Sequence, residues 1–416
     1  MLFLYNLSIK IYLVLLYLAR FFNTKAKLWI EGRKNIFANI EKQVDPAKQH
    51  IWFHFASLGE FEQGRPVLEK IRHLYPDRPL VITFFSPSGY ELRKNTPLAD
   101  HVFYLPADTR TNARKLVSLL NPALVIFTKY EYWYHYFKEL HERRIPLYVI
   151  SAVFRENQVF FKWYGTLNRN ILTLVTHFFV QDEFSAALLK TVGLHNVTVS
   201  GDTRFDRVAE NAASPKKFPQ VEKFCSGSDV FVAGSTWPDD EKLIASLVVK
   251  YPEWKFIIAP HEIKAEKIRA LEGLLPAGSS IRYSAVSDLH MGRQGNHRVL
   301  IIDNIGMLSS LYQYGRIAYI GGGFGVGIHN TLEAAAFAVP VIFGPNYHKF
   351  LEAKALIQRG AGFSIADVEE LSEVVAKLND AGYRMAAAVK AGAYVREQQG
   401  ATTTILNFIK GHELQS

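Results

Sequence analysis

The amino-acid sequence predicts an α/β protein with two doubly wound domains that face each other across a cleft, preceded by an apolar N-terminal helix. Three observations support this prediction. Short runs rich in Val, Ile and Phe alternate with helix-like runs after residue 50, which is typical of parallel sheets buried on both faces. A polar stretch at 207–228 interrupts the alternation, and the first 22 residues are mostly apolar.

The composition fits two globular domains. The chain has 416 residues, of which 49% are hydrophobic and 21% charged, so each domain can bury a sizeable core. Cys225 is the only cysteine, which excludes an internal disulfide and a cysteine-based zinc site and fits a reducing compartment. The net charge of +9 favours anionic partners. Because the cations are spread out and no nucleic-acid-binding motif is present, we expect a membrane surface or a phosphorylated ligand and no nucleic acid.

The first predicted element is a membrane-associating segment at 1–24. Its apolar part has about the length of a bilayer span and carries one charge, Lys10, before Arg20. It lacks the early positive charge and the small-residue end of a signal peptide. Five cations follow, at Arg20, Lys25, Lys27, Arg33 and Lys34. A spanning helix with this flank places the chain in the cytoplasm, and a helix lying flat meets anionic lipid. The third alternative is a helix packed on the protein's own core.

The first Rossmann-like domain is predicted at 25–206. Its strands are expected at 50–57, 79–86, 101–108, 122–133, 145–154, 172–182 and 197–202. Helix-like segments lie between them, the first at 61–74.

The polar stretch 207–228 has two prolines and no strand pattern, and we interpret it as the connection between domains. The second Rossmann-like domain is predicted at 229–416, with the alternative that its last helix packs back on the first domain. Its strands are expected at 229–235, 254–260, 280–285, 297–303, 315–323 and 339–345. Ligands of such sheets bind at the carboxyl ends of the strands, and two such domains commonly share a cleft.

A glycine-rich stretch at 319–345 predicts a nucleotide site. A strand ends on three glycines, the last of which is Gly323, and Gly325 keeps the next loop free of side chains. A helix is expected to begin near 329–331. Glycines let backbone N–H groups approach a phosphate, and a helix N-terminus favours an anion. The stretch matches neither the dinucleotide fingerprint nor the P-loop, so the phosphate-binding mode is a different one.

Polar residues around this stretch complete the predicted site. Glu333 can accept hydrogen bonds from both hydroxyls of a ribose, whereas Asn330 has the alternative role of capping the helix. Ser235 and Thr236 end another strand, where they bind a phosphate or cap the next helix. His261 ends a third strand.

Several motifs occur together in one order along the chain. They are HFASLGEFEQGRPVLEKIR, VIFTKYEYWYHYFKEL, GDTRFD, AGSTWPDDE, APHE and DNIGMLSSLYQYGRIAYIGGGFGVGIHNTLEAAAFAVPVIFGP. In these motifs the sequence resembles the Kdo transferases of lipopolysaccharide synthesis along nearly its whole length. The resemblance implies a GT-B glycosyltransferase fold and transfer of 3-deoxy-D-manno-octulosonic acid (Kdo) from CMP-Kdo to a lipid A precursor. It implies an enzyme at the cytoplasmic face of the inner membrane, with anionic lipid around it, CMP-Kdo as co-substrate and no cofactor.

Two acids follow a predicted turn at 57–59. Transfer to a hydroxyl needs a base near the attacking oxygen, and the resemblance assigns this role to Glu60, with inversion by direct displacement. From the residues alone, the alternative is a helix-start carboxylate favoured by the helix dipole. Glu62 lies two residues later, where a helix points it elsewhere, and we interpret it as an exposed helix residue.

Three further residues are expected to orient the substrates. The segment TKYEYWYH resembles the one that the family usually writes METELWPN; Glu131 keeps its place, and Lys129 replaces the first glutamate. Glu131 has a local ion pair as its alternative role. Arg204 stands where the family more often has lysine, and is expected to meet the donor carboxylate or a phosphate. Its alternative is a salt bridge near Asp206.

Two departures from the family pattern concern the nucleotide. The family often has A-P-R-H where this chain has His261 without the arginine, and Met307 follows Gly306 where glutamate is more common. The predicted nucleotide-binding residues are Ser235, Thr236, His261, Gly306, Gly323, Gly325, Asn330 and Glu333. No acidic pair has clear metal-binding spacing, so no metal requirement is predicted. The competing hypotheses are a GT-B transferase using another nucleotide sugar, such as a UDP-hexosamine, and a non-catalytic nucleotide- or lipid-binding scaffold.

Overall fold

The computed structural model describes residues 2–286 and 297–412. Met1 of the predicted membrane segment and residues 287–296 and 413–416 of the predicted second domain lie outside the described residues. The chain forms two compact units. The first comprises Met1–Arg207 together with Gln399–Ser416, and the second comprises Val208–Gln398.

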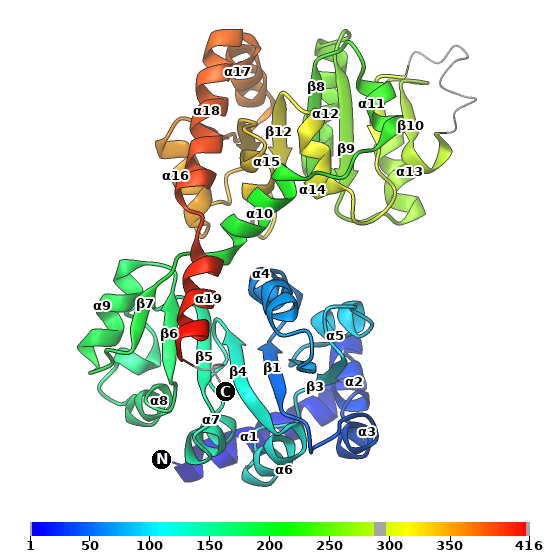
Figure 1. Cartoon of the computed structure of the whole chain (residues 1–416). Helices are drawn as coiled ribbons and strands as arrows, with labels where there is room; N and C mark the ends of the chain where they lie inside the picture. The colour runs from blue at the N-terminus through cyan, green and yellow to red at the C-terminus, as the bar shows by residue number, and fades with distance from the viewer. Residues whose placement is uncertain (1, 287–296, 413–416) are drawn as a thin grey trace. The chain divides into compact units, whose positions relative to one another are not determined.

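Each unit contains one sheet of seven parallel strands, which confirms the predicted fold class (Figure 1). The strand order is β3-β2-β1-β4-β5-β6-β7 in the first unit and β10-β11-β9-β8-β12-β13-β14 in the second. The strands of the first unit are β1 His50–Phe55, β2 Leu80–Phe84, β3 His101–Tyr104, β4 Pro122–Thr128, β5 Leu147–Ala152, β6 His177–Val180 and β7 Val197–Val199. Those of the second are β8 Val230–Thr236, β9 Lys255–Pro260, β10 Ser280–Arg282, β11 Val299–Ile301, β12 Ile317–Ile320, β13 Val341–Phe343 and β14 Gly362–Ser364.

The helices of the first part of the chain are α1 Leu2–Ala19, α2 Thr24–Glu31, α3 Ile36–Gln43, α4 Leu58–Leu74, α5 Pro87–Arg93, α6 Arg110–Leu120, α7 Tyr134–Glu142, η1 Val159–Phe161, α8 Thr166–Leu172 and α9 Glu183–Thr191. The later helices are α10 Thr203–Ala213, α11 Pro219–Cys225, α12 Pro238–Lys250, α13 Ala265–Leu274, η2 Tyr283–Ala285, α14 Leu308–Leu311, η3 Tyr312–Tyr314, α15 Leu332–Ala336, α16 Leu351–Gln358, α17 Val368–Asn379, α18 Ala381–Glu397 and α19 Ala401–His412. Two of these, α10 and α11, occupy most of the predicted connection.

Both faces of the first sheet are buried, as the apolar strands predicted. Successive residues of a strand point to opposite faces, so Trp52 joins the core on one face while Phe53 and Phe55 join the core on the other. The first of these cores also contains side chains of α6 and α7, and the second contains side chains of α4 and α19. This alternation decides which side chains of β1 meet which helices.

The C-terminal helix α19, drawn in red in Figure 1, belongs to the first unit. Its Ile405 and Ile409 are buried in the core that α4 covers. The carboxylate of Asp206 accepts hydrogen bonds from the backbone N–H groups of Gly400 at 2.7 Å and Thr402 at 2.6 Å. The last helix therefore packs on the first unit, which is the alternative given above for the second domain. It does so because the apolar side of α19 completes the core of the first unit.

The N-terminal helix α1 is long and apolar enough to cross a membrane, and it is largely uncovered by the rest of the unit. Its polar residues nevertheless contact the first unit. The Tyr5 hydroxyl donates to the carboxylate of Asp108, and Asn6 Oδ1 accepts from His135 Nε2 at 2.6 Å. Further along, the Tyr12 ring stacks on Phe85 with centroids 6.3 Å apart. The helix thus lies against the loops that follow the strands of the first sheet.

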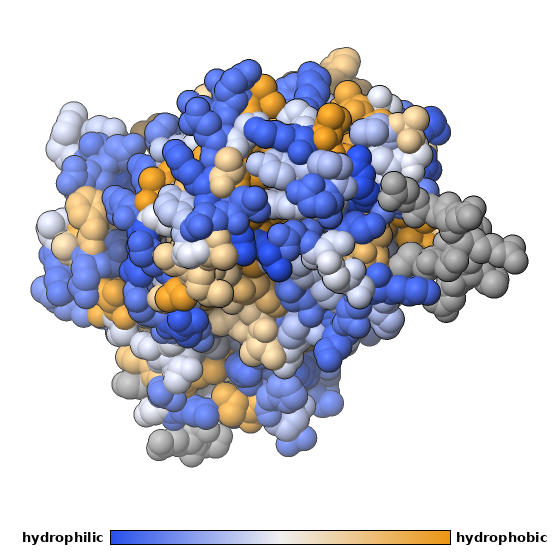
Figure 2. All heavy atoms as spheres, turned by 90° about the horizontal axis from the view of Figure 1, so that it is seen from above, coloured by the Kyte–Doolittle hydropathy of each residue, from blue (hydrophilic) through white to orange (hydrophobic). Residues whose placement is uncertain are grey.

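The face of the molecule that Figure 2 shows is mostly hydrophilic, with hydrophobic residues in small groups between the polar ones. Such a mixture is ordinary for globular domains. The exposed side chains of α1 are a different case, because they are large and apolar and recur along the whole helix. The most exposed of them are Phe3, Leu4, Ile11, Val14, Leu15 and Leu18, and the turn after the helix adds Phe21 and Phe22.

Candidate active site

In each sheet the connections from two neighbouring central strands run in opposite directions, and the loops that follow these strands diverge to leave room for a ligand. In the first unit this switch point lies between β1 and β4, and in the second it lies between β8 and β12. The predicted catalytic and orienting acids, Glu60 and Glu131, follow β1 and β4. Ser235 and the glycines that begin at Gly321 stand at the carboxyl ends of β8 and β12. Each unit therefore carries polar residues at its own switch point.

Glu60 lies in the first turn of α4, directly after β1. Its Oε2 accepts a hydrogen bond from the backbone N–H of Ala56 at 2.7 Å, and only 9% of the residue is exposed. Burial is the main cause that raises the pKa of Glu60, to about 7, and the charge of Glu131 raises this pKa further. The hydrogen bond from the Ala56 N–H and the charge of Lys129 lower it. Glu60 therefore has the helix-start place that its structural alternative assumes, and its raised pKa lies near the pH at which a general base works.

The predicted turn at 57–59 is wrong, because α4 already begins at Leu58. Ser57 is extended at the helix N-cap, and only Ala56 and Ser57 separate the strand from the helix. A Cβ atom at Gly59 would have only Ser57 Oγ within 4 Å, at 3.9 Å, and its φ is not positive. The first helical turn itself, and not the flexibility of glycine, places the Glu60 carboxylate beside β1.

Glu131 follows β4 and is held by two donors. Its Oε2 lies 2.6 Å from His54 Nε2 and accepts from Trp133 Nε1 at 3.0 Å. The sequence predicted Glu131 but missed His54, which lies on β1. The signal was present, because two histidines, His50 and His54, stand four residues apart on an otherwise apolar strand and therefore share a face.

Lys129 and Arg204 lie near these acids with different surroundings. Lys129 has a φ of 62°, a left-handed conformation at the end of β4, and its Nζ lies 5.7 Å from the centroid of the Tyr130 ring. Arg204 forms a salt bridge with Asp202 at 2.8 Å, whereas Asp206 binds the start of α19. The local salt bridge considered for Arg204 thus exists, with Asp202 as its partner.

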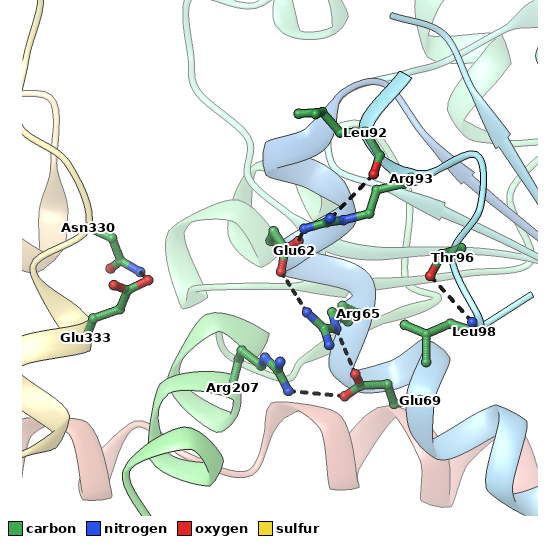
Figure 3. A network of polar contacts seen from close by, with 10 residues as sticks. All are labelled: Glu62, Arg65, Glu69, Leu92, Arg93, Thr96, Leu98, Arg207, Asn330 and Glu333. Atoms are coloured by element: carbon green, nitrogen blue, oxygen red, sulfur yellow. Dashed lines mark hydrogen bonds and ion pairs between the residues drawn. The ribbon is translucent and has the colours of Figure 1, made fainter. Parts of the chain in front are cut away.

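Glu62 belongs to an ion-pair network on the surface of α4 (Figure 3). It accepts from Arg93 at 2.6 Å and from Arg65 at 3.4 Å, and Arg65 also binds Glu69 at 2.7 Å. Arg207 donates to Glu69 at 3.2 Å. With 39% of its side chain exposed, Glu62 is a helix-surface residue that carries partners, in agreement with its interpretation from the sequence.

Asp240 organises the switch point of the second unit and was missed by the sequence prediction. Its carboxylate accepts from the backbone N–H groups of Trp237 and Gly322, both at 2.9 Å, and from the Tyr319 hydroxyl at 2.7 Å. The buried acid thereby joins the loop after β8 to the loop after β12. Ser235 precedes this junction with a φ of 53°, and burial raises the pKa of Asp240.

Three aromatic rings stack beside this junction. His261 lies between Trp237 and His329, with centroids 4.6 Å apart in both pairs. Trp237 Nε1 donates to His329 Nε2 at 3.2 Å, so His329 is neutral and carries its proton on Nδ1. Burial and the charge of His261 lower the pKa of His329 to about 4. Thr236 is buried, and its hydroxyl donates to Glu241 at 3.1 Å.

The remaining predicted nucleotide residues are in loops of the same unit. A Cβ atom at Gly323 would lie 2.6 Å from Gly344, so this glycine permits the close approach of the loops after β12 and β13. Gly325 faces open space apart from Gly322 O at 3.7 Å, and Gly306 has a φ of 91°. The helix α15 begins at Leu332, later than expected.

Asn330 and Glu333 lie at the start of α15 (Figure 3). Asn330 Oδ1 accepts from the N–H of Leu332 at 3.0 Å, and its Nδ2 donates to Glu333 at 3.3 Å. Asn330 therefore has the capping contact that the sequence left as its alternative.

No group of three or more His, Cys, Asp or Glu side chains suited to a metal ion occurs among residues 2–286 and 297–412. The prediction that activity needs no metal stays a prediction, because the structure does not test it.

Two doubly wound parallel sheets with polar residues at both switch points define the GT-B class of glycosyltransferase-like proteins. Residues 31–207 match the family described as 3-deoxy-D-manno-octulosonic-acid transferase (kdotransferase). The resemblance found in the sequence motifs is thereby confirmed.

Curated relatives extend the similarity beyond this region. The chain is 26% identical over 368 residues to the 3-deoxy-D-manno-octulosonic acid transferase of Chlamydia trachomatis, covering 84% of this chain and 82% of that protein. It is 25% identical over 383 residues to a bifunctional glycosyltransferase/methyltransferase of Fusobacterium nucleatum, covering 89% of this chain. The chain spans only 58% of the length of the latter protein. These relatives support a Kdo glycosyltransferase of lipopolysaccharide synthesis.

A solved structure supports the fold. The UDP-GlcNAc 2-epimerase from Neisseria meningitidis, bound to UDP-GlcNAc, has a TM-score of 0.61 and 17% sequence identity, and the match covers 88% of this chain and 100% of that one. At this identity the likeness concerns the fold alone.

Proposed function

We propose that this protein transfers Kdo from CMP-Kdo to a lipid A precursor with inversion at the sugar carbon, and that Glu60 is the general base. The observation that carries the proposal is the place of Glu60: a nearly buried carboxyl at the switch point of the first sheet, in the domain that matches the Kdo transferase family. A pKa of about 7 lets it accept a proton at physiological pH.

In the proposed reaction, an acceptor hydroxyl oxygen attacks the anomeric carbon of Kdo while Glu60 takes the hydroxyl proton. The bond between that carbon and the CMP phosphate oxygen breaks on the opposite side, and CMP leaves with the electron pair. One base is sufficient for such a displacement, and no covalent enzyme intermediate is needed. Glu131 orients a substrate hydroxyl, and the cations Lys129 and Arg204 meet the donor carboxylate or phosphate.

The second unit supports the donor half of the proposal. A Cβ atom at Gly306 would have nothing within 4 Å, so the backbone of the loop after β11 is open to a phosphate. In the loop after β12, Gly325 also faces open space, while its own N–H donates to Gly322 O at 3.0 Å. Ser235 stands at the end of β8, and Glu333 offers a carboxylate to a ribose. This chain lacks the arginine that the family often has before this histidine. His261, held in its ring stack, takes over the arginine's contact to the donor.

The helix α1 supports a lipid acceptor at the inner membrane. Its exposed apolar residues face away from the unit, whereas Tyr5 and Asn6 are bound to protein groups. A helix spanning the bilayer would have to release these contacts, so we propose that α1 lies flat in the cytoplasmic leaflet. Lys10, Arg20 and Lys25 then meet anionic headgroups.

The experiment that tests the function uses the purified full-length protein with CMP-Kdo, generated in situ, and a lipid A precursor. We expect a product whose mass has increased by one or more Kdo residues, and released CMP. Replacing Glu60 by Gln is expected to keep CMP binding but to abolish turnover. The matched control, Glu62→Gln, changes an acid two residues away on the same helix and is expected to stay active.

Two results would contradict the proposal. Turnover near the wild-type rate in Glu60→Gln would show that Glu60 is not the general base. Protection of the wild-type protein against thermal unfolding by UDP and not by CMP would indicate a different nucleotide sugar, such as a UDP-hexosamine.

A further inference from the structure

A buried histidine lies beside the proposed acids without a role in the reaction described so far. His54 is near the carboxyl end of β1, where the strand register places it between Thr83 of β2 and Phe127 of β4. Only 1% of its side chain is exposed. Its Nδ1 lies 2.8 Å from Thr83 Oγ1, and its Nε2 lies 2.6 Å from Glu131 Oε2. Two hydrogen-bond partners therefore fix the orientation of the ring.

The partners also decide which nitrogen carries the proton. The indole Nε1–H of Trp52 can only donate, and it donates to Thr83 Oγ1 at 2.8 Å. The Thr83 hydroxyl proton is then free to bind His54 Nδ1. An ionised Glu131 can only accept, so Nε2 must be the protonated nitrogen. The result is one directed chain from Trp52 through Thr83 and His54 to Glu131, in which every buried donor has an acceptor.

Both donors to Glu131 bind the same oxygen. His54 and Trp133 meet Oε2 at 2.6 and 3.0 Å, and no donor to Oε1 is found within the described part of the chain. The Glu131 side chain is 14% exposed, so the carboxylate is not sealed from solvent. One oxygen thus anchors the group while the other can accept a hydrogen bond from a substrate hydroxyl.

We propose that His54 is a positioning residue: its neutral imidazole, protonated on Nε2, holds the ionised Glu131 so that the second carboxylate oxygen receives a substrate hydroxyl. The inference rests on the proposed transferase function. It adds a residue that sets the orientation of Glu131, the acid that accompanies the proposed base Glu60. Because His54 is buried behind Glu131, it acts through that acid and does not touch the substrate.

The position of Glu131 also affects Glu60. The charge of Glu131 raises the pKa of Glu60, in the same direction as burial, while the Ala56 N–H and the charge of Lys129 lower it. The charge of Glu60 in turn acts on Tyr130 and Tyr132. If Glu131 were released from His54, its charge would act less strongly on Glu60. The base would then lose its proton at lower pH.

The test compares three variants in the Kdo-transfer assay. His54→Phe removes both hydrogen bonds, and we expect kcat to fall roughly 10- to 100-fold, the rate equivalent of one hydrogen bond to a charged group, with an unchanged KM for CMP-Kdo. His54→Gln keeps an N–H donor toward Glu131 and should retain most of the activity. The matched control is His50→Phe, a buried histidine on the same face of β1, which should behave like the wild type.

The pH dependence separates positioning from a structural role. We expect the acid limb of the kcat/KM profile to move to lower pH in His54→Phe and to stay in place in His54→Gln and His50→Phe. A structural role alone would lower the melting temperature of His54→Phe without moving this limb. Equal loss of activity in His54→Gln and His54→Phe, with an unmoved limb, would overturn the inference.

A spectroscopic measurement on the wild-type protein tests the tautomer independently of activity. In ¹⁵N-histidine-labelled protein, with the His54 signals assigned by comparison with His54→Gln, we expect a protonated Nε2 and an unprotonated Nδ1. A proton on Nδ1 alone would overturn the inference even if Kdo transfer is observed. If the wild type transfers no Kdo, the proposed function fails, while this measurement still decides which nitrogen of His54 carries the proton.

Discussion

At the residue scale, Glu60 carries an electrostatic cost that follows from its place. The carboxyl is nearly buried and receives the N–H of Ala56 at 2.7 Å, and Glu131 brings a second negative charge nearby. Burial dominates, so the neutral acid is favoured in the folded protein up to a pH of about 7. A base of this kind is useful because its pKa lies close to physiological pH, and the fold holds it there at the expense of stability.

This cost predicts the pH dependence of stability. The folded-state pKa of about 7 lies above the ordinary value of 4.5, so the folded state binds more protons between these values and stability falls as the pH rises through them. Glu60→Gln keeps an acceptor for Ala56 N–H and removes the charge. We expect it to raise the free energy of unfolding by up to roughly 3 kcal/mol at pH 8 and by almost nothing at pH 4, measured by urea denaturation.

The control for this measurement is Glu62→Gln, which loses ion pairs with Arg93 and Arg65 and should show no gain at pH 8. A difference between Glu60→Gln and the wild type that stays constant from pH 4 to pH 8 would contradict the buried-acid explanation.

At the scale of elements, Asp108 connects the apolar helix α1 to the start of α7. Its two oxygens accept from the backbone N–H groups of His135 and Tyr136, each at 3.0 Å, and from the Tyr5 hydroxyl. The N–H of Tyr134 donates to that same Tyr5 hydroxyl at 3.2 Å. Since α7 directly follows the loop of Glu131, the docking of α1 and the position of the site share one buried acid.

The variant Asp108→Ala is expected to destabilise the protein by about 1–3 kcal/mol, because it removes a helix cap and leaves buried N–H groups without an acceptor. It should also release α1, which would appear as faster hydrogen exchange of the amides of α1. The matched control is Asp182→Ala, which removes the cap of α9, where Asp182 accepts from Ser185 N–H at 2.7 Å. Equal exchange of α1 in the two variants would show that Asp108 does not hold this helix.

At the scale of the whole molecule, the end of the chain returns to its first unit. The helix α19 contributes Ile405, Leu406 and Ile409 to the core that α4 covers. The centroids of the Phe408 and His177 rings are 4.1 Å apart. The first sheet would otherwise leave this part of its face uncovered. The first unit is therefore built from both ends of the sequence.

This organisation predicts where a mutation near the C-terminus acts. Ile405→Ala removes a fully buried side chain and should cost about 2–5 kcal/mol. We expect the loss in the first unit, as faster hydrogen exchange of β1 and β4, with β8 and β12 unchanged. Thr403→Ala, at an exposed position of the same helix, is the control and should have little effect. Faster exchange in the second unit alone would contradict the division of the chain.

The elements were largely predictable because their signals are local. Buried strands of both sheets were found from short apolar runs, whereas β14, Gly362–Ser364, was missed because Phe363 is its only large apolar residue. The helices α10 and α11 were taken for a connection, since their sequence is polar and contains prolines. In the site, Glu60 and Glu131 were singled out through motifs, but His54 and Asp240 were not, because what identifies them is their partners.

The sequence by itself determined the two-domain α/β class, the apolar first helix and the acids and glycines at the ends of strands, because each depends on residues close together in the chain. The tertiary structure decided that β1 lies beside β4, which brings His54 to Glu131 across 77 residues. It also decided that Asp240 joins two loops and that α19 covers the first sheet. Such contacts depend on strand order and on which apolar face remains uncovered, and local sequence patterns predict neither.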